Sequence, residues 1–155
     1  MSKAEVIKII ETVASTNGIS PGDFVKFAYI ETGGQFNANA HNKSSDAKGL
    51  FQFIPATAKE YNIEGKEFDP KSNTEAAAKL YLDNKQTLLN MGYSNPTVAD
   101  MYISHQQGCG GYKSIQTAAK EGKFLLNSTR TNILHNVSSI DIQKVFFFLY
   151  CHLLG

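Results

Sequence analysis

Hydrophobic residues recur along the first third of the chain at intervals of three and four, which is the spacing of one face of an α-helix. The first such stripe consists of Val6, Ile9, Ile10 and Val13. Ser2 and Glu5 stand before it in the spacing of a capping box, and Asn17-Gly18 follows it as a stop signal. The pattern predicts an amphipathic helix that serves as scaffold.

A second stripe ends on a charged residue. Its members lie at i, i+3, i+4 and i+7, and they are Phe24, Phe27, Ala28 and Glu31. Ser20 and Pro21 fit the N-cap and the first helical position, and Thr32-Gly33-Gly34 ends the pattern. We therefore expect Glu31 at the end of a helix, on its inward face and beside a turn.

The middle of the chain alternates between polar and helical stretches. Residues 35–48 are polar and predict a loop or a short hairpin. Pro55 can open a helix that continues to Tyr61. A connecting loop from Asn62 to Asn73 precedes a predicted helix from about Thr74 to Asn90, which Met91-Gly92 ends.

A further helical pattern begins after Asn95-Pro96. Its stripe consists of Val98, Met101, Tyr102 and His105. The run Gly108-Cys109-Gly110-Gly111 that follows is too rich in glycine for a helix and predicts a flexible corner. A short helix from Tyr112 to about Lys120 completes a mainly α prediction.

Length and composition fit one globular domain over residues 1–155. The chain is 42% hydrophobic and 19% charged and has a formal net charge of +1. It has no basic block, and Arg130 is its only arginine, so we expect no nucleic-acid partner. Cys109 and Cys151 are too few for a metal framework or a disulfide scaffold. They could pair with each other, but buried free thiols are the preferred interpretation.

The two ends of the chain bear on its location. Residues 1–5 lead into an amphipathic pattern and not into a continuous apolar run, so we expect no signal peptide and synthesis in the cytoplasm. Residues 145–154, VFFFLYCHLL, lie in an atypical apolar segment at 143–155. Ten residues are too few to span a bilayer. The segment could be a buried terminal helix, an interfacial anchor or an unnatural end, and we expect no stable membrane anchor.

The position of Glu31 suggests acid–base chemistry. An apolar surrounding destabilises a charged carboxylate, so the pattern predicts a raised pKa for Glu31. A raised carboxyl pKa suits a general acid near neutral pH. The alternative is a structural glutamate at a helix end that pairs with a lysine.

Two short motifs favour the catalytic interpretation. Residues 31–40 read Glu-Thr-Gly-Gly-Gln-Phe-Asn-Ala-Asn-Ala, and residues 49–58 read Gly-Leu-Phe-Gln-Phe-Ile-Pro-Ala-Thr-Ala. They resemble the first two motifs of the soluble lytic transglycosylases, relatives of goose-type lysozyme, in which Glu-Ser precedes Gly-Phe-Asn-Pro-Asn-Ala and Gly-Leu-Met-Gln precedes Met-Pro-Ala-Thr-Ala. The resemblance covers about residues 20–115. It implies a lysozyme-like, SLT-type helical domain with Glu31 as the catalytic acid and no metal or cofactor.

The resemblance also implies residues that bind substrate. In the first two motifs these are Thr32, Gly49, Gln52 and Phe53. A third family motif, Ala-Tyr-Asn-x-Gly, aligns on Gly108 and places His105 and Gln106 at its tyrosine and asparagine. Because the motif tyrosine is absent there, Tyr102, one turn earlier, could supply the hydroxyl or could simply be a core residue.

Asp46 is the residue on which the reaction type depends. Its Ser-Ser-Asp context is typical of a turn, which is the preferred interpretation. Goose-type lysozymes, however, carry an acidic residue in this region. A hydrolase of that type would use Asp46 as a second acid, whereas a lytic transglycosylase needs Glu31 alone.

The resemblance therefore implies a monomeric glycosidase whose partner is the glycan strand of peptidoglycan. The bond would be the β-1,4 linkage between N-acetylmuramic acid and N-acetylglucosamine, cleaved to a 1,6-anhydro end. Such a small domain looks like a bacteriophage enzyme that acts on the bacterial wall, either released at lysis (an endolysin) or carried on the virion. The alternatives are a goose-type lysozyme and a non-catalytic wall-binding or structural phage protein.

Overall fold

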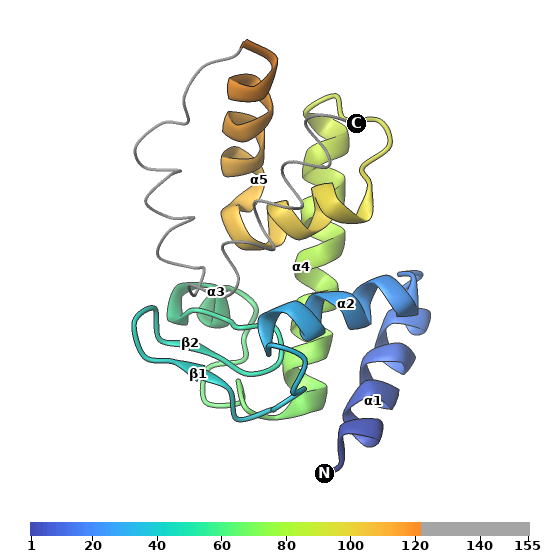
Figure 1. The fold of residues 1–155 in the computed structure, drawn as a ribbon, viewed down its shortest axis with the longest axis vertical. Helices are drawn as coiled ribbons and strands as arrows, with labels where there is room; N and C mark the ends of the chain where they lie inside the picture. Colours follow the sequence, from blue (N-terminus) through green and yellow to red (C-terminus); the bar gives the residue numbers. More distant parts are fainter. Residues whose placement is uncertain (122–155) are drawn as a thin grey trace. The chain divides into compact units, whose positions relative to one another are not determined.

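A computed structural model describes residues 1–121, which form five helices and one two-stranded hairpin (Figure 1). In chain order they are α1 (Lys3–Thr16), α2 (Pro21–Glu31), β1 (His41–Asn42), β2 (Ala47–Lys48), α3 (Pro55–Glu60), α4 (Pro70–Asn90) and α5 (Val98–Glu121). The chain divides into two compact units between Leu82 and Asp83. The mainly α prediction, with a short hairpin after the second helix, is confirmed.

The first helix forms as its end signals predict. The Ser2 backbone N–H donates to Glu5 Oε2 over 2.6 Å, and the Glu5 N–H donates to Ser2 Oγ over 3.3 Å. These two bonds complete a capping box at the start of α1. Val6, Ile10 and Val13 of its stripe are buried, Ile9 is half-buried, and α1 packs against α2, so the predicted amphipathic helix is confirmed.

An aromatic cluster forms the core of the first unit. Phe24 and Phe27 on α2 are each 1% exposed. The Phe24 ring stacks on Phe51 with centroids 4.6 Å apart, and the Tyr81 ring meets Phe24 edge-on at 6.0 Å. This packing buries the apolar face of α2 and fixes the direction in which the helix ends.

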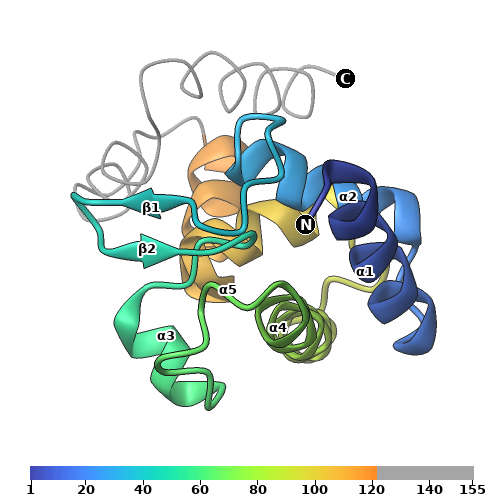
Figure 2. The ribbon, with the colours of Figure 1, turned by 90° about the horizontal axis from the view of Figure 1, so that it is seen from below.

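The hairpin lies beyond the end of that helix. Its strands β1 and β2 pair antiparallel, with His41 opposite Lys48 and Asn42 opposite Ala47. A further bridge joins Lys48 to Phe53 and brings the following loop against β2. In both ribbon views the C-terminal end of α2 points toward the hairpin (Figures 1 and 2).

The start of α4 differs from the prediction. The helix begins at Pro70 and not near Thr74, so the loop before it is shorter than predicted. Asp69 explains the difference, because its Oδ2 accepts the Ser72 N–H over 2.7 Å and its carbonyl accepts the Asn73 N–H over 2.9 Å. An aspartate followed by proline is a favourable helix start.

The predicted glycine-rich corner between two helices is confirmed at Gly108, but it is narrower than predicted. In the second unit, the range called α5 consists of two helices that meet at a kink at Gly108, with φ 68° and ψ 165°, and the second of them already includes Cys109, Gly110 and Gly111. The helix also begins after Thr97, whose hydroxyl and N–H both bond to Asp100 Oδ2. A single glycine thus makes a kink where four residues were expected to make a corner.

The sequence predictions about a membrane span, a metal site and the two cysteines can be compared with the described residues. Within residues 1–121, no helix is long and apolar enough to cross a membrane. The same part of the chain contains no group of His, Cys, Asp or Glu that could hold a metal ion. Cys109 is a free, half-buried thiol whose pKa burial raises. Cys151, Arg130 and the apolar segment at 143–155 lie outside the described residues.

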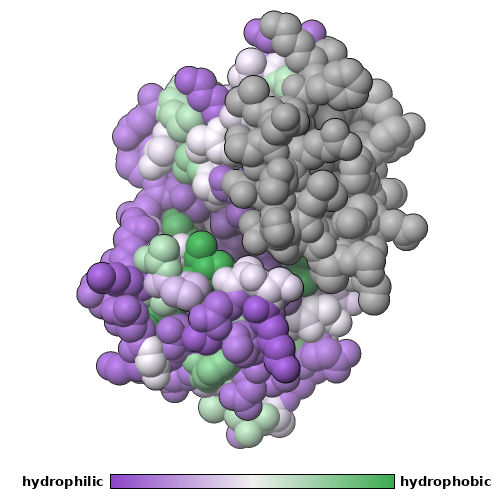
Figure 3. All heavy atoms as spheres, turned by 90° about the vertical axis from the view of Figure 1, so that its left-hand side faces the viewer, coloured by the Kyte–Doolittle hydropathy of each residue, from purple (hydrophilic) through white to green (hydrophobic). Residues whose placement is uncertain are grey.

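One face of the described part of the chain is mostly polar. Figure 3 shows a face on which hydrophilic residues predominate and hydrophobic ones appear in small groups. The most exposed large hydrophobic residues after Met1 are Tyr29, Ile54, Phe68, Leu82, Leu89 and Met91. Single exposed residues of this kind are normal on a globular protein.

Candidate active site

Glu31 is the last residue of α2 and is half-buried. The residues that precede it on the same face, Phe24, Phe27 and Ala28, are buried, as the spacing predicts. The Ser20–Pro21 start is also confirmed in position, although the Ser20 side chain makes no capping bond to the helix backbone. The carboxyl group therefore projects from an apolar face at the point where the helix stops.

A tightly bonded turn follows Glu31. The Gly34 N–H donates to the Tyr29 carbonyl over 2.7 Å, which closes the end of the helix. Thr32 Oγ1 donates to the Ala28 carbonyl over 2.7 Å and accepts the Phe36 N–H over 2.9 Å. The Thr32 hydroxyl thus uses its only proton inside the turn and links the last helical turn to the chain beyond it.

We predict that Thr32→Val lowers stability and that Thr32→Ser does so much less. Valine has the same shape as threonine but leaves the Phe36 N–H, at a buried position, without its acceptor. Loss of one partner of a buried hydrogen bond costs about 1–3 kcal/mol. Urea unfolding of the three proteins measures the difference. Equal midpoints for the valine and serine variants would show that the hydroxyl does not hold the turn.

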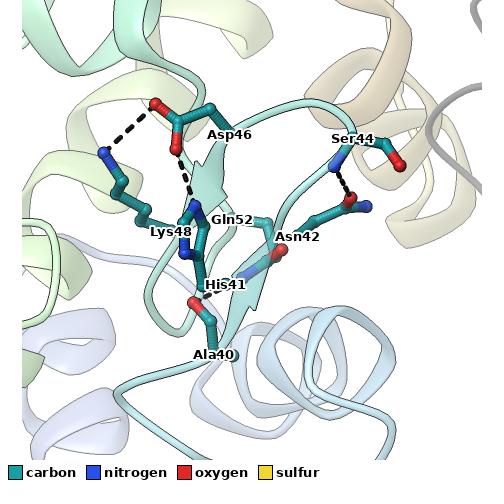
Figure 4. A network of polar contacts seen from close by, with 7 residues as sticks. All are labelled: Ala40, His41, Asn42, Ser44, Asp46, Lys48 and Gln52. Carbon is teal, nitrogen blue, oxygen red and sulfur yellow. Dashed lines mark hydrogen bonds and ion pairs between the residues drawn. The ribbon is translucent and has the colours of Figure 1, made fainter.

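The second motif begins with a loop that is held by hydrogen bonds from the Gln52 side chain. Gln52 has φ 50°, and its Nε2 donates to the Gly49 carbonyl over 2.8 Å. It also donates to the Ala40 carbonyl over 3.2 Å (Figure 4). Phe53 is 3% exposed and packs edge-on against Tyr61. The amide nitrogen of Gln52 therefore joins this loop to the start of the hairpin, and the Phe53 ring belongs to the core.

Gly49 lies where the chain passes closest to another segment. Its φ is +80°, and a Cβ at this position would overlap the Glu67 carbonyl oxygen and the Asn73 amide nitrogen. Only glycine meets both conditions, a left-handed backbone and no side chain. The glycine that the motif contributes is therefore required by packing.

Asn73 is a buried residue whose side chain hydrogen-bonds to two other segments, and the sequence did not predict this role. It is 0% exposed, its Oδ1 accepts the Phe51 N–H over 2.9 Å, and its Nδ2 donates to the Glu67 carbonyl over 2.7 Å. A longer bond of 3.4 Å reaches the Lys48 carbonyl. The available signal was an amide residue in the first turn of a helix that starts at Asp69-Pro70, but nothing local indicates its distant partners.

Asp46 lies in the turn of the hairpin, with φ 55°, so its interpretation as a turn residue is confirmed. Its Oδ1 lies 2.6 Å from His41 Nε2 and its Oδ2 lies 3.2 Å from Lys48 Nζ (Figure 4). The hydrogen bond from His41, followed by that from Lys48, lowers the pKa of this carboxyl. Asp46 is therefore an ionised, exposed carboxylate with a partner on each oxygen.

The third group of predicted residues lies in the second unit, on α5. Tyr102 is 5% exposed, and its hydroxyl accepts a 2.6 Å hydrogen bond from Gln106 Nε2. The His105 ring lies nearly parallel to that of Tyr102, at 22°, with centroids 6.5 Å apart. The structure thus brings Tyr102, His105 and Gln106 together on one helix. Their predicted contacts with substrate stay predictions.

A mainly helical domain, with a short hairpin after a helix that ends in glutamate, is the lysozyme-like class of fold. Residues 8–127 match the family described as the transglycosylase SLT domain, and the chain belongs to this family. The match includes every residue of the candidate site. A search among curated proteins finds no match. Family membership supports peptidoglycan-cleaving transglycosylase activity in general.

Proposed function

We propose that the chain is a lytic transglycosylase that cleaves the β-1,4 bond between N-acetylmuramic acid and N-acetylglucosamine, with Glu31 as its acid and base. The observation that carries this proposal is the position of Glu31, half-buried at the end of a helix whose preceding inward residues are apolar. Apolar surroundings favour the protonated form of a carboxyl group, which is the form that a general acid requires. The substrate class follows from the family.

The proposed reaction needs one carboxyl group of the protein. Glu31 protonates the glycosidic oxygen as its bond to the anomeric carbon breaks, and the acetamido carbonyl of the substrate stabilises the oxocarbenium ion. The Glu31 carboxylate then removes the proton from the C6 hydroxyl of the same sugar. That oxygen bonds to the anomeric carbon and forms a 1,6-anhydro end, so no water is consumed.

The pairing of Asp46 favours this route over hydrolysis. A retaining hydrolase requires a second carboxylate about 5–5.5 Å from the acid, free to approach the anomeric carbon. Both oxygens of Asp46 are instead engaged by side chains of the hairpin, His41 on one oxygen and the Lys48 ammonium on the other. A carboxylate whose two oxygens are both engaged and whose pKa is lowered is a poor nucleophile and a poor base.

We predict that wild type and Asp46→Asn both release muropeptides with 1,6-anhydro ends. Asparagine keeps the size of the side chain and removes the charge that a second catalytic acid would need. Mass spectrometry of digested cell walls distinguishes the products, because a hydrolysed end is heavier by one water. Reducing ends from wild type, together with loss of activity in Asp46→Asn, would instead identify a goose-type lysozyme with two acids.

A non-catalytic wall-binding protein is the second candidate function. It would bind purified walls without lowering their turbidity. The same digestion therefore tests it, since a binding protein releases no muropeptide of either kind.

A further inference from the structure

A lysine from the first helix contacts the turn that follows Glu31. Lys3 Nζ donates to the Gly34 carbonyl over 3.0 Å and lies 5.1 Å from the centroid of the Phe36 ring. The two contacts join residues 31 and 33 positions apart in the sequence. The capping box of Ser2 and Glu5 fixes the backbone on both sides of Lys3, so the lysine projects from an ordered helix start.

The contacted turn has a conformation that needs support. Gly34 has φ 79° and Phe36 has φ 53°, and a left-handed backbone is unfavourable for a residue with a side chain. Residues held in this region persist only when their surroundings fix them. The Phe36 ring is 5% exposed and meets Tyr29 edge-on, so it cannot move without disturbing the last turn of α2.

The charge of Lys3 also suits this position. The last turn of α2 contains no basic residue of its own. A helix C-terminus carries partial negative charge on its carbonyl groups and favours a nearby cation. An ammonium bonded to a carbonyl just beyond the helix supplies that cation from α1, and the aromatic face of Phe36 attracts the same group.

We propose that Lys3 is a positioning residue, which holds the 33–36 turn and thereby the direction of the Glu31 carboxyl group. The proposal rests on the proposed function of Glu31, because it concerns the geometry of the same site. Lys3 itself need not touch the substrate. Its loss should slow the chemical step and leave substrate binding nearly unchanged, since a small displacement of a catalytic group can cost a large factor in rate.

Four variants test this proposal on uncross-linked glycan strands. Lys3→Met keeps the apolar stem and removes the ammonium, Lys3→Arg keeps a cationic donor, and Lys8→Met removes an exposed lysine from the same helix. We expect kcat to fall about tenfold in Lys3→Met with KM within about twofold, to recover in Lys3→Arg and to stay unchanged in Lys8→Met. The amide resonances of Gly34 and Phe36 should shift in Lys3→Met alone.

The fourth variant, Glu31→Gln, separates the two proposals. If it is inactive while Lys3→Met retains wild-type kcat, Lys3 has no positioning role and the proposed function stands. An active Glu31→Gln would overturn the proposed function itself. An effect of Lys3→Met on KM alone, or an equal loss in Lys8→Met, would also contradict the positioning role. Thermal unfolding of each variant shows whether a loss of rate reflects a loss of fold.

Discussion

Replacing Glu31 by glutamine should abolish cleavage of purified cell walls and leave the fold intact. Glutamine has the size of glutamate and can occupy the same half-buried position at the end of α2. It cannot donate a proton to the leaving oxygen or accept one from the C6 hydroxyl. General acid–base catalysis contributes about a hundred- to ten-thousand-fold to such reactions, so we expect a loss of at least about a hundredfold.

Glu60→Gln is the matched control for this experiment. Glu60 is the last residue of α3, also a glutamate at a helix end, but exposed. The decrease in turbidity of a wall suspension measures activity, and circular dichroism with thermal unfolding measures the fold. We expect Glu60→Gln to clear walls at the wild-type rate. Clearance by Glu31→Gln at a tenth of that rate or faster would show that Glu31 is not the acid.

Replacing Gly49 by alanine should destabilise the domain far more than the same change at Gly65. Both glycines have left-handed backbones, with φ of +80° and +77°, so alanine is strained at either one. A Cβ on Gly49 would also overlap the Glu67 carbonyl and the Asn73 amide, whereas a Cβ on Gly65 meets nothing within 4 Å. The comparison therefore separates steric overlap from backbone strain.

We expect the Gly49→Ala variant to be less stable than Gly65→Ala by about 1–3 kcal/mol, the usual cost of forcing an extra methyl group into a packed site. Urea unfolding of the two variants and wild type gives the free energies. The wall-cleaving rate of Gly49→Ala at a temperature where it remains folded gives a second result. Equal stability of the two variants would mean that the loop moves away from Asn73 without cost.

The elements near Glu31 could be predicted because their signals are local. The 3–4 spacing of Phe24, Phe27 and Ala28 predicts the buried face, Pro21 predicts the start and Gly33-Gly34 predicts the end. Helix propensity and capping act over a few residues, so a short sequence window contains the information. The catalytic role implied for Glu31, by contrast, came from the two motifs, because spacing alone favoured a structural glutamate.

The remaining features depend on contacts that a short window does not contain. Asn73 bonds to the Phe51 N–H and the Lys48 carbonyl, which are 22 and 25 positions away. Lys3 reaches Gly34 across 31 positions. At Gly108–Gly111 the local preference against a helix was overridden everywhere but at Gly108, which shows that propensity is only a weak guide where packing decides.

The bond from Phe51 to Asn73 has a consequence for the motion of the domain. The amide hydrogen of Phe51 bonds to Asn73 Oδ1, and the first turn of α4 holds this acceptor in place. Because Asn73 also bonds to the Lys48 carbonyl, we expect fraying of this helix end and release of the 48–53 loop to occur together, as one small cooperative unit. We therefore expect hydrogen exchange at the Phe51 amide, within the second family motif, to depend on the stability of the helix start at Asp69-Pro70, some 20 residues later.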